Sequence, residues 1–476
     1  MEVIIYPLIA LLVGIVLSLI TGTLKKGDVA RTISILSLIT AISLLAVFYP
    51  FNGQRLFSDT IVLDNFGGFF VFLFLSLAVF ILLGSTKVLD EHPEMPALLL
   101  LSTIGMALIG ITDNLVMIFV AWELMSLTTY VLAGLGKREQ STEAAMKYYI
   151  YGSVSSALIL FSISLIYGIT GSMQLSIIAT VASSLDTTAI GVLLLSATIF
   201  IFGFGYKVGI VPFHLWLPDV YEGSPAPVSG LLAGVSKKVA IVATARIFLT
   251  GFESVDFNWK ILYAIIAVIT MTVANIAALS QRKVVRMFAY SSISQIGYMI
   301  VGFAIFSPEG LAATMMQLTV HAVTTVGAFI TIGIIAKKLD LRTYDDYKGL
   351  GARKPVLGLG LTIMMLSLAG IPPLAGFVSK LFLFTEAVRA NLLWLAIVLV
   401  LNSVLSLGYY LPLIRNMYLE KPEKTTEGEE TKKEKFDTRT IGPIMVNIMT
   451  TLAIVIIPIF AQKIFDIITE AAKNVI

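Results

Sequence analysis

Long runs of apolar residues, separated by short polar breaks, repeat along almost the whole chain. Each run has about the length that an α-helix needs to cross the hydrocarbon core of a bilayer, roughly 20 residues. The pattern therefore predicts an all-α polytopic membrane protein with about fourteen transmembrane helices. The expected helices cover residues 3–22, 31–50, 66–87, 96–111, 114–134, 144–170, 188–217, 229–250, 258–280, 287–306, 309–336, 355–385, 391–412 and 441–462.

Lysine and arginine are distributed unequally between alternate loops, which tests the helix count. Loops after the odd-numbered helices and the helix ends beside them carry 23 basic residues, whereas the opposite loops and the C-terminal end carry five. The first set is Lys25, Lys26, Arg31, Lys87, Lys137, Arg138, Lys147, Arg282, Lys283, Arg286, Lys337, Lys338, Arg342, Lys348, Arg353, Lys354 and seven residues from Arg415 to Arg439. Because the basic side of a membrane protein faces the cytoplasm, both termini are predicted to face away from it.

Two polar segments interrupt the apolar pattern. Residues 421–439 form a run of mixed charge without apolar periodicity, which predicts a solvated loop. Residues 172–187 are too short and too polar to span a bilayer comfortably, and they are expected to form an amphipathic surface stretch.

A short sequence pattern occurs twice, as GIVPF from Gly209 and as GIPPL from Gly370. Proline inside a helix removes a donor and clashes with the carbonyl four residues earlier, so both helices should break near mid-membrane. Paired broken helices are typical of internal repeats, commonly inverted, with the transport site between them. The alternative is that two short matches arose by chance. On the repeat hypothesis the chain divides into 1–95 (three helices), 96–250 and 258–412 (two five-helix inverted repeats), 413–440 (a charged loop) and 441–476 (the last helix and tail).

Overall composition supports a membrane protein and narrows its chemistry. The chain has 476 residues, of which 57% are hydrophobic and 13% charged, more apolar surface than one soluble core could bury. The formal charge of +3 comes from loop residues and indicates topology rather than nucleic-acid binding. The chain has no cysteine, so thiolate-held iron–sulfur clusters and disulfides are excluded within it.

Several ionisable residues nevertheless fall inside the apolar windows. A charge at this depth costs at least roughly 2.5–3.5 kcal/mol, so a group of them calls for a function. We expect them to carry protons, because burial and a nearby carboxylate can switch a lysine between its neutral and charged forms. The candidates for this proton relay are Glu123, Lys207, Lys237, Lys238, His321 and Lys380.

Each candidate also has a structural alternative. Glu123 and Lys207 could form contacts that only fix helix packing, and His321 could be a packing histidine. One of Lys237 and Lys238 is expected to extend to the surface, which would leave the other as the central relay. Arg246 lies near the end of its helix and is expected to be an interface anchor.

Five longer motifs, in this order, resemble one family: WELMSLTTYVLAG, EAAMKYYIYGSVSSALILFSISLIYGITGS, VPFHLWLPDVYEGSPAPVSGLLAGVSKK, RMFAYSSISQIGYMIVG and MMLSLAGIPPLAGFVSKLFLF. The family is that of the antiporter-like membrane subunits of complex I, which also includes Mrp antiporters and membrane-bound hydrogenases. The second and fifth motifs look most like the N type of bacterial subunit, although His321 is typical of the L, M and Mrp types.

This resemblance implies that Glu123 and Lys207 are the coupling pair of one half-channel. It also implies that Lys237 or Lys238 is the central relay and that Lys380 is the exit-side residue. Trp216 and Pro218, in the loop after the first broken helix, are expected to be structural.

The implied function is proton translocation within a respiratory complex that oxidises NADH, or F(420)H(2) in an archaeon, and reduces a quinone or phenazine. No phosphate-binding or flavin motif is present in the chain, so energy should arrive from partner subunits. We expect no cofactor here, with quinone, flavin and iron–sulfur clusters in the partners: other membrane subunits and a peripheral redox arm. The rival functions are a subunit of an Mrp-type Na⁺/H⁺ antiporter, a subunit of an energy-converting hydrogenase, and a scaffold that moves no protons.

Overall fold

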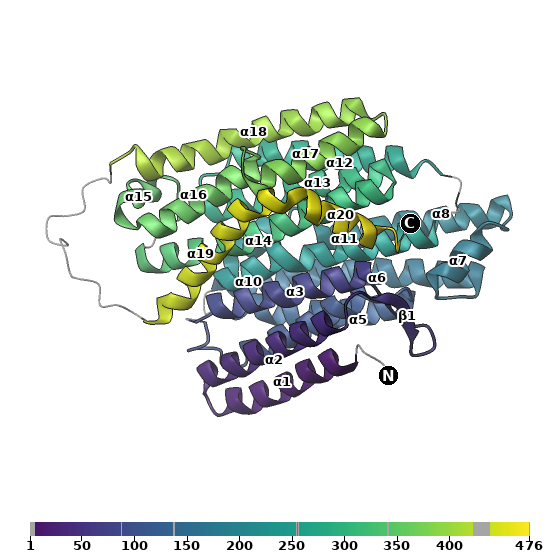
Figure 1. Ribbon diagram of the computed structural model, residues 1–476, viewed down its shortest axis with the longest axis horizontal. Helices are drawn as coiled ribbons and strands as arrows, with labels where there is room; N and C mark the ends of the chain where they lie inside the picture. The colour runs from purple at the N-terminus through teal and green to yellow at the C-terminus, as the bar shows by residue number, and fades with distance from the viewer. Residues whose placement is uncertain are drawn as a thin grey trace.

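The structure is a computed structural model that describes residues 5–475 except 87, 137–138, 254, 256, 340–341 and 422–437. Most of the charged segment 421–439 therefore lies outside the described residues, as do Lys87, Lys137 and Arg138. Figure 1 shows a bundle of roughly parallel and antiparallel helices running along the long axis of the molecule.

Twelve described segments are long and apolar enough to span a membrane, and two shorter apolar helices complete the set of expected spans. The spans of single helices are α1 Ile5–Thr23, α2 Gly27–Val47, α3 Asn65–Gly84, α5 Leu115–Ala133, α6 Glu139–Thr170, α8 Thr187–Val208, α12 Trp259–Leu279, α13 Val284–Ile305, α14 Pro308–Leu339 and α18 Leu393–Tyr418. Two spans are composite: Ala226–Gly251 (α10 Ala226–Leu231, η1 Leu232–Ser236, α11 Lys237–Arg246, η2 Ile247–Gly251) and Ile441–Ala472 (α19 Ile441–Ile456, η5 Ile457–Phe460, α20 Ala461–Ala472). The shorter helices are α4 Met95–Gly110 and α16 Pro355–Ala369.

Short elements mark the two ends of the bundle. A hairpin of β1 Asn52–Leu56 and β2 Ile61–Asp64 and the short helix α7 Leu175–Ala182 lie at one end, which we call the hairpin end. The opposite end, which we call the basic end, holds α9 Leu217–Gly223, η3 Asp345–Tyr347, α15 Leu350–Arg353 and η4 Thr438–Thr440 near or within its loops. The first and last described residues both lie at the hairpin end, as an even number of spans requires (Figure 1).

Three spans form the core of the molecule. The segment 226–251, α13 and α14 are buried along nearly their whole length, whereas α1, α2 and α18 leave one apolar side outward. An apolar outer surface over buried polar groups is the arrangement that a lipid solvent favours. These central spans carry Lys237, Lys238 and His321, so the candidate relay lies in the most protected part of the bundle.

Both predicted helix breaks are confirmed, and they have the same geometry. Helix α8 ends at Gly209 (φ 82°) and α16 ends at Gly370 (φ 85°), each in the left-handed region that glycine tolerates. The next amide donates back across the last turn in both, from Ile210 to Gly205 and from Ile371 to Leu366, at 3.0 Å. Such a cap satisfies carbonyls at a helix end that water cannot reach. After the breaks come α9 and α17 Ala375–Arg389.

The two broken helices approach their breaks from opposite ends. Helix α8 starts at the hairpin end, whereas α16 starts at the basic end (Figure 1). This opposite orientation supports the interpretation of the chain as an inverted repeat.

Other local features differ from expectation or were missed. The hairpin was not predicted, because its strands are short and lie in a loop between two spans. Residues 172–187 contain α7, which buries Leu175, Ile178 and Ala182 on one side, in agreement with the amphipathic expectation. The last span continues past residue 462 to Ala472, with a 3₁₀ turn around Pro458.

Candidate functional site

Glu123 lies on α5 at the boundary between that helix and α6. Asn114 begins α5 by accepting from the backbone amides of Val116 (3.0 Å) and Met117 (3.2 Å). Two turns later Glu123 is half-buried, and its carboxylate accepts a hydrogen bond from the Ser156 hydroxyl. The carboxylate is therefore held at the rim of the chain rather than in its centre.

Lys207 sits in the last turn of α8, just before the break, with only 3% of its surface exposed. Its ammonium donates to the Ser126 hydroxyl at 2.9 Å. The ammonium also lies over the rings of Tyr148 (4.6 Å), Tyr130 (4.7 Å) and Trp122 (5.8 Å). Such a cage of aromatic faces stabilises a desolvated cation without neutralising it.

Glu123 and Lys207 interact electrostatically, but no ion pair joins them directly. Among the described residues, Lys207 has no carboxylate oxygen within 4 Å. Glu123 and Lys207 therefore lie within electrostatic range of each other without forming a salt bridge. Separation of this kind lets a proton on one change the charge of the other without locking both into a permanent salt bridge.

Lys237 and Lys238 follow a π-helical turn, Leu232–Ser236, in the middle of a span. Both side chains are buried, at 1% and 0% exposure, so the expectation that one extends to the surface is wrong. Lys237 donates to the Ser292 hydroxyl at 3.4 Å and lies 5.0 Å from the ring of Tyr221. Lys238 instead donates to the carbonyl of Ala233. Turns of the π type leave carbonyls without their usual partner, and Lys238 supplies one donor there.

His321 is buried on α14, where its ring contacts the Thr325 hydroxyl at 3.2 Å. It lies within electrostatic range of Lys237, Lys238 and Lys380. The histidine therefore connects the central lysines to the second half of the chain.

Lys380 lies on α17 and folds back to the second break. Its ammonium donates to the carbonyl of Leu368 at 2.8 Å and lies 4.4 Å from the ring of Tyr298. The same carbonyl accepts from Gln295 at 3.1 Å. Two further hydrogen bonds extend this network across three helices, from Gln317 to Gln295 (2.8 Å) and from Ser379 to Gln317 (2.6 Å).

Arg246, which was expected to be an interface anchor near the end of its helix, is buried and ion-paired, unlike the four buried lysines. Its guanidinium is 4% exposed and makes a two-pronged pair with Asp64 at 2.7 and 2.8 Å. It also donates to the carbonyl of Gly110 at 2.7 Å. Asp113 lies beside this pair and bonds Arg55 at 3.0 Å, yet burial raises the pKa of Asp113 above its usual value. Arg246 thus joins the helix of Lys237 to the first three helices.

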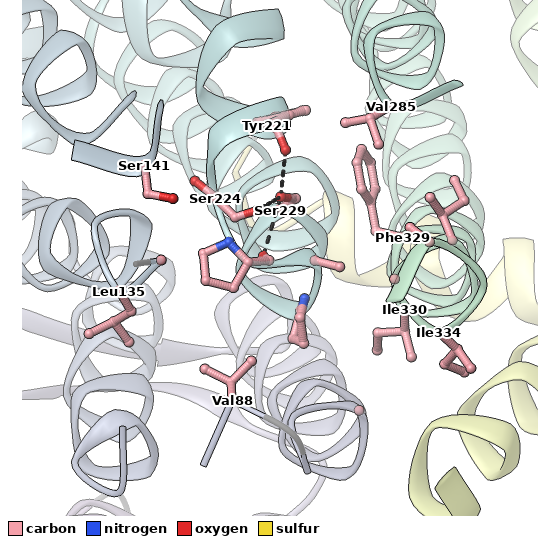
Figure 2. A pocket seen from close by; sticks show the side chains of 18 of the residues that line it. Val88, Leu135, Ser141, Tyr221, Ser224, Ser229, Val285, Phe329, Ile330 and Ile334 are labelled. Carbon is pink, nitrogen blue, oxygen red and sulfur yellow. Dashed lines mark hydrogen bonds between the residues drawn. The ribbon is translucent and has the colours of Figure 1, made fainter. Parts of the chain in front are cut away.

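A cavity of about 480 Å³ opens at the basic end and reaches toward Lys237. Figure 2 shows apolar side chains around the cavity, among them Val285, Ile330 and Ile334 on one side and Leu135 on the other, together with three serines. The serines are Ser141, Ser224 and Ser229.

The floor of this cavity is aromatic. Tyr221 and Phe329 both line it, with their rings edge to face at 5.6 Å. Since the ring of Tyr221 also covers the Lys237 ammonium, water in the cavity would stop one side chain short of the central lysine. The arrangement can bring protons close to Lys237 while keeping it dry.

The loop after the first break is structural, as expected. Trp216 donates from its indole nitrogen to the carbonyl of Tyr206 at 3.1 Å and stacks on Tyr148 at 4.8 Å. Pro218 occupies the first turn of α9, where a missing amide hydrogen costs nothing. These contacts hold the cage around Lys207 in place.

Sequence reasoning missed the neutral members of the site. Ser126, Tyr148, Tyr221 and Ser292 contact the buried lysines, but serine and tyrosine are too common in apolar helices to stand out. Only the amides offered a signal, because a glutamine such as Gln295 within a span demands a hydrogen-bonding partner.

Comparison with known proteins gives a consistent result. Residues 112–406 match the family model described as NADH:quinone oxidoreductase/Mrp antiporter, TM. The chain is 40% identical to F(420)H(2) dehydrogenase subunit N of Methanosarcina mazei, over 78% of each chain. It is 37% identical to NADH-quinone oxidoreductase subunit N of Trichlorobacter lovleyi, over 88% of this chain and 85% of the relative.

Solved structures agree with the fold. A chain of respiratory complex I from Thermus thermophilus superposes with a TM-score of 0.79 at 27% identity, covering 97% of this chain and 98% of that one. A chain of the Mrp complex from Dietzia gives a TM-score of 0.86 at 22% identity, covering 99% and 97%, which speaks to the fold alone.

Proposed function

Because the chain belongs to the NADH:quinone oxidoreductase/Mrp antiporter family of membrane proteins, we propose that it is the proton-translocating N-type subunit of a respiratory oxidoreductase complex. The observation that carries this proposal is the burial of Lys207, Lys237, Lys238 and Lys380, each at most 5% exposed, in the core of a membrane protein. Among the described residues none of them has a carboxylate within 4 Å. Four unneutralised lysines are too costly for a scaffold.

In this proposal the proton relay runs along the middle of the bundle. Glu123 takes or gives a proton at the rim, and its charge sets whether Lys207 keeps its own proton. Lys237 is the central relay, since it points to Ser292 and Tyr221, whereas Lys238 is tied to a main-chain carbonyl. His321 passes the charge on to Lys380, and the network of Gln295 and Gln317 orients that last carrier.

The driving energy and the redox groups belong to partner subunits. Moving one charge against roughly 200 mV costs about 4.6 kcal/mol, which must come from a coupled reaction. The two relatives named above belong to complexes that oxidise NADH or F(420)H(2), so we assign quinone, flavin and iron–sulfur clusters to a peripheral redox arm bound to the membrane part. Half-buried Glu123 is placed to sense a neighbouring membrane subunit.

The distribution of basic residues between the loops supports the proposed orientation. The basic end faces the cytoplasm and the hairpin end, with both termini, faces away from it. The cavity of Figure 2 then opens on the side from which protons are taken up.

An Mrp-type antiporter or a hydrogenase subunit is the less supported function. The similarity to the Mrp complex concerns the fold, whereas identities of 37–40% connect the chain to N-type subunits of redox complexes. Co-purification separates these functions, because recovery with iron–sulfur and quinone-site subunits supports the redox pump and recovery with cluster-free membrane subunits alone supports the antiporter.

Substitution of the relay tests the proposal directly. The purified complex, reconstituted in vesicles, would be measured for protons moved per electron with Glu123→Gln and Lys207→Met. We expect at least a tenfold loss of pumping with normal assembly, since neither residue is needed for a direct ion pair. Exposed Lys260→Met serves as a control for the loss of one lysine and should pump normally. Normal pumping by both relay variants would refute the assignment.

A further inference from the structure

A second group of buried polar side chains lies in the latter half of the chain, outside the relay described above. The phenol of Tyr409 donates to the side-chain oxygen of Asn275 at 2.9 Å. The amide nitrogen of Asn275 donates to the side-chain oxygen of Asn402 at 3.0 Å. All three residues are at most 5% exposed, and they join α12 to α18. We call Tyr409, Asn275 and Asn402 the amide cluster.

The amide cluster adjoins a cavity at the basic end. This cavity has a volume of about 410 Å³, and its lining includes Gln281, Arg282, Tyr344 and Tyr409. Tyr344 donates to the backbone carbonyl of Tyr409 at 2.9 Å, which fixes the mouth against α18. Because the cavity of Figure 2 is lined by Arg342, two residues from Tyr344, both cavities open at the same end of the bundle.

On its inner side the amide cluster meets the surroundings of Lys380. Tyr298 lies beside Asn275, Ser294 and Ser403, and its ring is 4.4 Å from the Lys380 ammonium. A side chain at Gly370 would meet both that ammonium and the Ser403 hydroxyl at 3.7 Å, so these two groups flank the second break. The polar side chains thus continue from the cavity to Lys380.

Three hydroxyls along this stretch, those of Ser294, Tyr298 and Ser403, are buried close to one another, but none makes a hydrogen bond of good geometry to a described residue. A buried polar atom without a partner costs about 1–3 kcal/mol. Hydroxyls that lie near one another without bonding directly can be bridged by water, which needs two to four polar partners. A purely structural role for this cluster would not explain why three buried hydroxyl groups of this kind lie beside a lysine.

We propose that the amide cluster, with Tyr298, Ser294 and Ser403, forms a second proton-uptake route that leads from the basic end to Lys380. The proposal rests on the proposed function, since it supplies a proton to one member of that relay. A proton enters from water in the 410 Å³ cavity, and bridging water carries it between the hydroxyls of the route, each of which accepts one proton and releases another to the next water. The last water gives its proton to the neutral amine of Lys380, which becomes an ammonium. The amides orient the hydroxyls and do not themselves change charge.

The route differs from what an inverted repeat alone predicts. In an inverted repeat, the half-channel of the second repeat would open at the hairpin end. The family resemblance also implies that protons leave Lys380 toward that end. A route from the basic end lets Lys380 be loaded without a proton passing Glu123 and Lys207. The second repeat would then take up protons independently of the first repeat. Lys380 would receive protons both from the relay and from the route through the amide cluster.

Single-hydroxyl substitutions test this route with little risk to folding. Ser403→Ala removes an oxygen that lies near Tyr298 but makes no hydrogen bond of good geometry to a described residue, so a structural role predicts little effect. Tyr409→Phe removes the phenol that donates to Asn275 within the amide cluster. For each variant complex, protons moved per electron would be measured in vesicles, and assembly on native gels. We expect both variants to assemble and to lose at least half of the proton yield.

The matched control is Tyr263→Phe, which also removes a buried phenol oxygen without a partner among the described residues, on α12 but away from the amide cluster. It should pump like the unmodified complex. If Ser403→Ala and Tyr409→Phe both pump normally while Lys380→Met does not, the route is refuted and the relay stands. If Lys380→Met also pumps normally, the proposed function itself fails.

Discussion

The two broken helices end in the same way, yet they carry their lysines on opposite sides of the break. Lys207 precedes Gly209 on α8, whereas Lys380 follows Gly370 on α17. Both ammonium groups nevertheless lie close to the break, because Lys380 folds back onto the carbonyl of Leu368. The position of the lysine in the sequence is therefore not repeated, but the position of its ammonium group beside the break is.

The surroundings of the two lysines differ in kind. Lys207 is enclosed by three aromatic rings and senses the carboxylate of Glu123. Lys380 is surrounded by a carbonyl, the ring of Tyr298 and amides, and no described carboxylate acts on it. If both lysines carry protons as proposed, the first would respond to the charge of Glu123, and the second would respond only to neutral dipoles.

The largest effect is expected from Lys207→Arg and Lys380→Arg. A guanidinium keeps the positive charge but does not release its proton. If both lysines carry protons, each variant should lower pumping at least tenfold in reconstituted vesicles. If Lys207→Arg retains pumping and Lys380→Arg does not, the first half needs only a fixed positive charge, whereas the second half needs a group that binds and releases a proton.

The central lysines should differ from each other as well. Lys237→Met should lower pumping at least tenfold, because a positioned proton-transfer group typically contributes about 10²–10⁴-fold to a rate. Lys238→Met removes a donor to the Ala233 carbonyl, so it should lower the free energy of unfolding by about 1–3 kcal/mol. It should lower pumping only two- to threefold. Equal pumping losses would contradict the separation into a relay and a structural lysine.

Much of this arrangement follows from sequence because the lipid solvent is so restrictive. Apolar windows located the spans, the Gly-Ile-X-Pro pattern located both breaks, and the cost of charge selected Lys207 and Lys380. The ion pairs between distant helices could not be predicted from the sequence. Arg246 and Asp64, for example, are 182 positions apart. The π turn before Lys237 was also hidden, because its residues have the composition of any apolar helix. Local pattern determines elements, whereas the relay depends on contacts between distant helices.

Arg246 offers a test of how the first half is anchored. Removing one partner of a buried ion pair costs about 3–5 kcal/mol, so Arg246→Gln should lower the unfolding free energy of the complex by that amount. Adding Asp64→Asn should recover part of the loss, because no unpaired charge remains. Thermal unfolding of detergent-solubilised complex measures both. A single variant as stable as the original would mean that the pair does not anchor the helix of Lys237.

The glycines at the two breaks should respond unequally to alanine. Both sit at positive φ, so each substitution costs about 1–2 kcal/mol in backbone strain. At Gly209 the new methyl group would also overlap Leu217 (2.0 Å), whereas at Gly370 its nearest neighbour is the flexible side chain of Lys380 (3.2 Å). Gly209→Ala should therefore reduce assembly, and Gly370→Ala should leave assembly near normal while slowing pumping. Native gels and vesicle assays separate the two outcomes.

The smallest effect concerns the segment after each break at low pH. After the first break, Asp219 on α9 is partly buried, and burial alone would raise the pKa of its carboxyl group. Hydrogen bonds from Lys147 (2.8 Å) and Arg286 (2.7 Å) outweigh this effect and lower the pKa below its usual 3.8. A carboxyl with a lowered folded-state pKa adds stability above its usual pKa, and that stability is lost as pH falls through the folded value. After the second break, α17 has the Arg389–Glu386 pair, with Arg389 largely exposed. Asp219→Asn should therefore flatten the loss of thermal stability below about pH 5, whereas Arg389→Gln should leave that loss unchanged. An unaltered acid profile in Asp219→Asn would mean that the ion pairs at the basic end do not hold α9 in place.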